Sequence, residues 1–187
     1  MEELKKKCQA IITEHAKVLN QLEKFTKIGH TISEIRYILQ RLDELGPWKP
    51  AELTQDAVYE IVMLQTALAV CYGRLFTSGN TTKINPKDIP EELQEVHSEL
   101  MSLRHKRFSH HDDHQSITTD LEFGFDGKTM LVYHKLSIQM TLGVPEKTPE
   151  LIDWISGHMK QKSEKALKHL NDKSGYDWKT ALPSDDE

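Results

Sequence analysis

The segment Asp88–Gln115, DIPEELQEVHSELMSLRHKRFSHHDDHQ, decides how the rest of the chain is interpreted. Its first part carries the signals of a helix start, because Asp88 and Glu91 have capping-box spacing and Pro90 lies in the first turn. Apolar residues then alternate in steps of four and three, the pattern of one face of an α-helix: Ile89, Leu93, Val96, Leu100 and Leu103. We therefore expect an amphipathic helix that begins near Asp88.

The C-terminal part of this segment is polar and basic. Only Phe108 interrupts a run made of Arg104, His105, Lys106, Arg107, Ser109, His110 and His111. The helix dipole favours cations near a helix C-terminus, which accounts for one or two of these residues. Simple alternatives remain: Lys106 and Arg107 can form a solvated basic surface, and Arg104 and His110 can serve only to end the helix. The density of imidazole and guanidinium groups nevertheless points to a site.

An arginine and a histidine can in principle cleave RNA without a metal. A histidine of ordinary pKa can take the proton of the 2′-hydroxyl as this group attacks the adjacent phosphate. A guanidinium then stabilises the extra negative charge of the phosphorane. In a straight helix, Arg104 and His110 would lie roughly 9 Å apart along the axis and about 120° around it. Either the helix ends near Phe108, or two chains share the site.

The string LRHKRFSH at positions 103–110 resembles the signature of the HEPN superfamily, all-α domains common in prokaryotic toxins and antiphage defence. That signature is an arginine, then a polar residue, a short variable run and a histidine, and it is matched by Arg104, His105 and His110. The context is similar to the abortive-infection-associated branch, since an Arg-Leu-Phe closes the preceding apolar helix. The resemblance extends from about Gln55 to His114, and more loosely to about Lys173.

This resemblance implies a metal-independent endoribonuclease of the toxin or antiphage-defence type. It implies that Arg104 binds and polarises the phosphate, that His110 acts as acid or base, and that His105 orients or assists. We expect substrate contacts at Lys106, Arg107 and His111, and no cofactor. The resemblance also implies a homodimer with a composite cleft lined by both motif helices, with RNA and an antitoxin protein as further partners. The alternative is a catalytically inactive dimeric module of the same fold that binds nucleotide, RNA or a partner protein.

A second alternative is a metal-binding protein. The run His110-His111-Asp112-Asp113-His114 places two histidines four residues apart, a spacing that suits zinc on a helix, with carboxylates between them. However, the run lies where a helix is expected to end, and no distant pair of cysteines or histidines completes a ligand set. We therefore assign no metal ligands.

Composition describes an ordinary protein of 187 residues with a net charge of −5, which gives no global nucleic-acid signal. The N-terminus has no apolar signal-peptide core, and polar residues interrupt the longest apolar run, Ile61–Phe76. We therefore expect a cytoplasmic protein without a membrane span. Cys8 and Cys71 occupy apolar helical positions, which predicts buried, reduced thiols.

The expected fold class is all-α: an up-down bundle of four to five helices with a small β-hairpin inserted before the last helix. One HEPN-like domain would span residues 1–174, with an N-terminal helix at 1–45, a motif-bearing core at 55–115, the hairpin at 116–143 and the last helix at 149–173. Residues 175–187 would form an acidic tail. The N-terminal helix either breaks at Gly29, with a second helix from Ser33 to Glu44, or continues as one bent helix.

The hairpin is predicted from a change of period. Polar and apolar residues alternate after Ile117, and Asp126-Gly127 is a tight-turn signal. The stretch Lys135–Leu142 is a candidate for a third short strand. A two-stranded hairpin is not stable alone, so we expect it to pack on the helices or on a partner chain.

Overall fold

A computed structural model of the protein describes residues 1–46, 53–77, 84–104, 117–138 and 144–180. These residues form five α-helices, one short 3-10 helix (η2) and one two-stranded sheet: α1 Glu2–Glu14, α2 Ala16–Leu45, α3 Gln55–Thr77, η2 Pro86–Asp88, α4 Glu91–Ser102, β1 Ile117–Phe125, β2 Met130–Ile138 and α5 Thr148–Ser174. The expectation of a mainly helical fold with a small hairpin before the last helix is confirmed. No described helix is long and apolar enough to cross a membrane.

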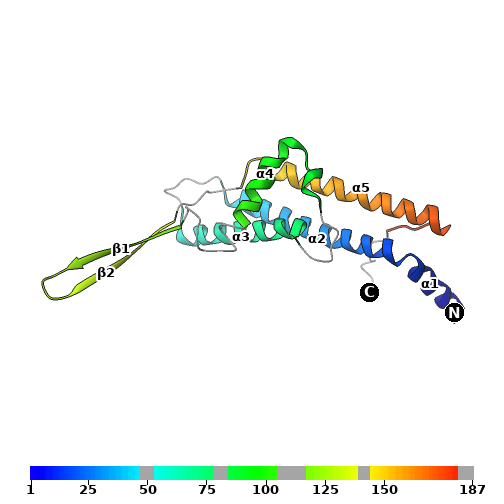
Figure 1. Ribbon diagram of the computed structural model, residues 1–187, viewed down its shortest axis with the longest axis horizontal. Coiled ribbons are helices and arrows are strands. Elements are labelled where there is room, and N and C mark those ends of the chain that lie inside the picture. The colour runs from blue at the N-terminus through cyan, green and yellow to red at the C-terminus, as the bar shows by residue number, and fades with distance from the viewer. Residues whose placement is uncertain (47–52, 78–83, 105–116, 139–143, 181–187) are drawn as a thin grey trace.

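The core lies among the long helices α2, α3 and α5 and the short helix α4, which lies across them (Figure 1). Helix α2 contacts both α3 and α5 along its length. Each helix contributes fully buried residues to one continuous cluster, for example Ile35, Tyr72, Leu100, Leu151 and Ile155. The apolar stripe expected on the motif helix is confirmed, because Leu93, Val96 and Leu100 are all buried.

Helix α2 runs without a break through Gly29, so the expected break there is wrong and the alternative of a continuous helix holds for Ala16–Leu45. An interior glycine costs a helix only about 1 kcal/mol. Burial of Ile28, Ile32 and Ile35 on either side of Gly29 offsets that cost. The chain bends instead at His15, between α1 and α2, where φ is −100° and ψ is 13°.

Helix α4 begins at Glu91 with Pro90 at its N-cap, and no side chain caps it. The expected capping box of Asp88 and Glu91 is therefore wrong. The reason is that Pro90 disfavours helical backbone at Ile89, whose ψ is 131°. Asp88 closes the short 3-10 helix and faces α5 instead, with its Oδ2 3.6 Å from Nζ of Lys162.

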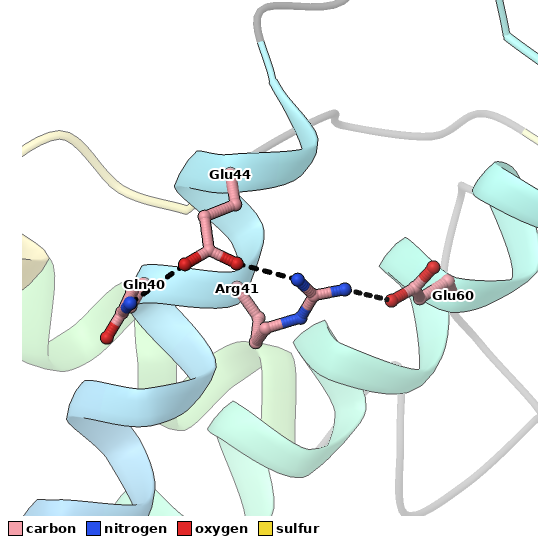
Figure 2. A network of polar contacts seen from close by, with 4 residues as sticks. All are labelled: Gln40, Arg41, Glu44 and Glu60. Carbon is pink, nitrogen blue, oxygen red and sulfur yellow. Dashed lines mark hydrogen bonds and ion pairs between the residues drawn. The ribbon is translucent and has the colours of Figure 1, made fainter.

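The C-terminal turn of α2 is joined to the first turns of α3 by a polar network (Figure 2). Arg41 donates to Glu44 of its own helix at 2.6 Å and to Glu60 of α3 at 3.1 Å. Gln40 donates to the other oxygen of Glu44 at 2.8 Å. These side chains are partly exposed, so the network contributes little stability and mainly sets how the two helices meet.

The hairpin prediction is confirmed. Its turn is closed by Asp126, whose Oδ1 accepts from the backbone N–H groups of Lys128 at 2.9 Å and Thr129 at 2.7 Å. Gly127 has φ of +95°, which a residue without a side chain adopts freely. The expected third strand is wrong for residues 135–138, because β2 continues to Ile138 in register with β1. Residues 139–142 lie outside the described part of the chain.

The two cysteines differ in burial. Cys71 is buried as expected, and its burial and the nearby Glu34 carboxylate raise the pKa of its thiol. Cys8 is exposed, so that prediction is wrong. Periodicity identifies the apolar face of a helix but not whether another element covers it, and α1 has no buried residues.

The chain beyond α5 turns back towards α1 rather than trailing away from Gly175. Gly175 ends α5 with φ of +70°. The backbone N–H of Trp178 donates to Oδ1 of Asn171 at 2.6 Å, and its indole lies edge-on to the His15 ring at 6.2 Å. The acidic residues 181–187 lie outside the described part of the chain.

Candidate functional site

Arg104 lies where the motif helix changes its winding. The α-helix α4 ends at Ser102, Leu103 is its C-cap and still donates its backbone N–H to the carbonyls of Glu99 and Leu100, and a π-helical turn begins at Leu103 and Arg104. Such short π segments inside or at the ends of helices frequently occur at functional sites. The separation expected between Arg104 and His110 assumed one straight α-helix, but the α-helix ends before Arg104.

The side chain of Arg104 lies directly against the backbone of α3 at Gly73. A Cβ atom placed on Gly73 would lie 2.5 Å from Nε and 3.1 Å from Cζ of Arg104, closer than real side chains approach. Only glycine at this position leaves room for the arginine. The Arg104 side chain is partly exposed, so it lies against α3 at the surface of the bundle. A guanidinium keeps its charge at any physiological pH.

A buried polar pair lies in the two helices that hold this contact. The Tyr72 hydroxyl of α3 lies 2.7 Å from Nδ1 of His97 of α4. The ring of Phe76 packs 4.6 Å from the His97 ring and 5.1 Å from the Tyr72 ring, measured between centroids. Burial raises the pKa of Tyr72 and lowers the pKa of His97, so both groups are neutral. The tyrosine donates to Nδ1 in the tautomer that carries the histidine proton on Nε2, and accepts in the other tautomer.

This pair joins α3 and α4 immediately beside the arginine contact. Tyr72 precedes Gly73 in the chain, and His97 lies two turns before Arg104 on α4. Tyr72 has no exposed surface and His97 has 8%. The pair can therefore fix how α4 lies on α3, and so where Arg104 emerges, but it cannot contact a substrate directly.

A second histidine, His158 of α5, joins η2 to α5. His158 stacks on Trp154 with 4.8 Å between ring centroids, and its Nε2 lies 3.5 Å from Oδ2 of Asp88. Burial lowers the pKa of His158, the positive charge of Lys162 lowers it further, and the Asp88 carboxylate opposes both effects. We interpret this cluster as structural, because it ties η2 to α5.

The other predicted site residues lie outside the described part of the chain. These are His105, Lys106, Arg107, His110 and His111, together with the His–Asp run at 110–114. The structure thus brings Arg104 to Gly73 and leaves the arrangement of the histidines as a prediction. Among the described residues, no group of three or more histidines, cysteines or acidic residues could hold a metal ion.

Sequence reasoning did not identify Gly73 or Tyr72 as parts of this region. One signal was present, because an isolated glycine inside an otherwise apolar helix usually has a packing reason. The partner of that glycine could not be read from the chain, since Arg104 is thirty-one residues later. No protein-family model, curated protein or solved structure matches this chain.

Proposed function

We propose that the protein is a metal-independent endoribonuclease of the HEPN-like, toxin or antiphage-defence type. The observation that supports this most is the position of Arg104. A cation that cannot lose its proton is held on a glycine at the surface, at the first residue of the basic run that continues with His105 and His110. A guanidinium held in place in this way suits a phosphate, which it can bind through two parallel hydrogen bonds.

The proposed reaction is an internal transesterification. His110 takes the proton of the 2′-hydroxyl, the 2′-oxygen attacks the phosphorus, and the bond to the 5′-oxygen breaks. Arg104 stabilises the charge that develops on the non-bridging oxygens. A second histidine, His105 or His111, or a water molecule returns a proton to the leaving 5′-oxygen. The products are a 2′,3′-cyclic phosphate and a 5′-hydroxyl.

The proposal includes a homodimer in which the motif helices of two chains line one cleft. Lys106, Arg107 and His111 would contact the neighbouring phosphates, which position a substrate without selecting its sequence. A net charge of −5 means that this attraction for RNA is local to the basic run. An antitoxin protein that covers the run would keep the enzyme inactive until it is needed.

The test is RNA cleavage by the wild type beside Arg104→Ala and His110→Ala, in the presence of a metal chelator. Removing a charged group that stabilises the transition state costs roughly 10²–10³-fold in rate, so each variant should lose at least that much. Arg36→Ala is the matched control, because Arg36 is an exposed arginine paired at 2.8 Å with Asp153, on the α2–α5 side of the bundle. Circular dichroism checks the fold of every variant.

Three outcomes would count against the proposal. A wild type that neither cleaves RNA nor slows growth would favour the inactive binding module. An equal loss in Arg36→Ala would mean that the effect of Arg104→Ala is not specific. Cleavage that stops with chelator and returns with zinc would make the His–Asp run the site.

A further inference from the structure

The two faces of the β1–β2 hairpin differ in chemistry. The pairing places Leu121 opposite His134, Phe123 opposite Val132 and Phe125 opposite Met130. Because side chains alternate along a strand, these six residues share one face, which we call the apolar hairpin face. Its side chains are exposed, with Phe123 at 64% and Phe125 at 66% of their full accessibility.

The opposite face of the hairpin carries the charged side chains, beside the exposed Leu131 and Tyr133. It carries Asp120 opposite Lys135, and Lys135 forms an ion pair with Glu122. Tyr133 lies over Gly124 on this face, with its Cε2 3.1 Å from where a Cβ of Gly124 would be. In the described part of the two strands, the carboxylate and ammonium groups lie on this face. The apolar hairpin face carries none of them.

The hairpin extends away from the helices at one end of the molecule (Figure 1). The described helices leave the apolar hairpin face uncovered. A two-stranded ribbon is at best marginally stable in water unless another surface covers it.

We propose that a second copy of this chain covers the apolar hairpin face, with the two hairpins packed face to face about a two-fold axis. In such an interface the same patch is used on both chains, and residues near the axis meet their own equivalents. A charged side chain there would face a like charge. The described apolar hairpin face has no carboxylate, ammonium or guanidinium group, and His134 is its only titratable residue.

The area available fits a dimer of modest strength. An aromatic side chain covers roughly 150–250 Å² when fully buried. The two phenylalanines and the three aliphatic or thioether side chains of the apolar hairpin face, each about half to two-thirds exposed, therefore present on the order of 500 Å² per hairpin. Two such faces bury on the order of 1,000 Å², the lower limit for a specific interface.

This interface is separate from the contact between motif helices in the proposed function and does not depend on it: a chain with the hairpin contact alone forms a dimer, and a chain with both two-fold contacts assembles beyond a dimer. Sedimentation velocity of the full chain between about 1 and 100 μM, the range in which a modest interface assembles, measures the dissociation constant. Phe123→Asp should raise that constant by about 1,000-fold, because each copy loses an aromatic anchor. Tyr133→Asp is the matched control: Tyr133 is an exposed aromatic one residue from Val132, on the opposite face. It should leave dimerisation unchanged.

Phe125→Ser is a second variant that introduces no charge, and it should also weaken the dimer. A wild type that stays monomeric at about 100 μM would overturn the proposal and leave this face to a different protein. An assembly whose size and dissociation constant are the same in the wild type, Phe123→Asp and Phe125→Ser would overturn the proposal and place every interface elsewhere, on the motif helices for example. An equal loss in Tyr133→Asp would also overturn it.

Discussion

Replacing Gly73 by alanine tests whether the position of Arg104 matters for function. The added methyl group would lie 2.5 Å from Nε of Arg104 and closer still to its Cδ, so the arginine side chain must leave its place on α3. The helix backbone has no reason to move. Gly73 lies inside α3, and the atoms that would clash belong to a flexible and partly exposed side chain.

The expected changes in stability and in activity therefore differ. Alanine is favoured over glycine inside a helix by about 1 kcal/mol, which offsets the loss of packing between Arg104 and α3. We expect the free energy of unfolding to change by less than about 1 kcal/mol in either direction. The guanidinium, however, moves by on the order of 1 Å or more, and a displacement of that size can reduce a catalytic rate by about 10²-fold.

Gly29→Ala provides a matched control, because it makes the same substitution inside α2 where an added Cβ would meet nothing within 4 Å. Urea denaturation gives the stability of each variant, and RNA cleavage gives its rate. Gly29→Ala should cleave at the wild-type rate. If Gly73→Ala cleaves as fast as the wild type while Arg104→Ala is inactive, the place of Arg104 on α3 is not the catalytic one. If Gly73→Ala unfolds, the arginine cannot be displaced and the reasoning about packing is refuted.

Two further predictions concern the buried histidines. Tyr72→Phe removes the hydrogen-bond partner of His97 Nδ1 and leaves this buried ring nitrogen unpaired, so the free energy of unfolding should fall by about 1–3 kcal/mol in urea denaturation. A loss below about 0.5 kcal/mol would contradict the hydrogen bond. Burial lowers the folded-state pKa of both His97 and His158 from 6.5, so below pH 6.5 the unfolded chain binds protons that the folded chain does not. The contribution of these two neutral histidines to the free energy of unfolding should be fully present above pH 6.5. The free energy of unfolding should fall as the pH drops from 6.5 towards about 5 at constant ionic strength. An increase over that range would contradict the conclusion that the two histidines are neutral and buried.

The sequence alone identified features that depend on neighbouring residues. The apolar steps of four and three in the motif helix predicted the buried face of α4, and the structure confirms it. The turn at Asp126-Gly127 was predicted from its two residues, because the carboxylate and the positive φ act within four residues of chain. The end of α5 lies within a few residues of the predicted one for the same reason.

Local signals were wrong where a neighbouring residue or a contact from elsewhere in the chain outweighed them. A glycine suggested a break in α2, but burial of the isoleucines beside it keeps the helix intact through Gly29. Asp88 had the spacing of a helix cap, yet Pro90 delays the helix and the carboxylate lies beside Lys162 of α5. Each preference is worth about 1 kcal/mol, which burial of one or two side chains exceeds.

For the candidate site as well, the sequence determined some features and the tertiary structure determined others. Residue types and their order were enough to select Arg104, because charge and hydrogen-bonding capacity belong to a side chain wherever it lies. The tertiary structure decided three other features. Arg104 lies against Gly73, and His97 is buried with Tyr72. The apolar hairpin face is exposed, whereas Leu100 is buried. An apolar residue at a buried position and an apolar residue at an exposed position can fit the same sequence pattern. Only the packing of distant segments determines which of them another surface covers, because burial depends on what lies opposite and not on the residue itself.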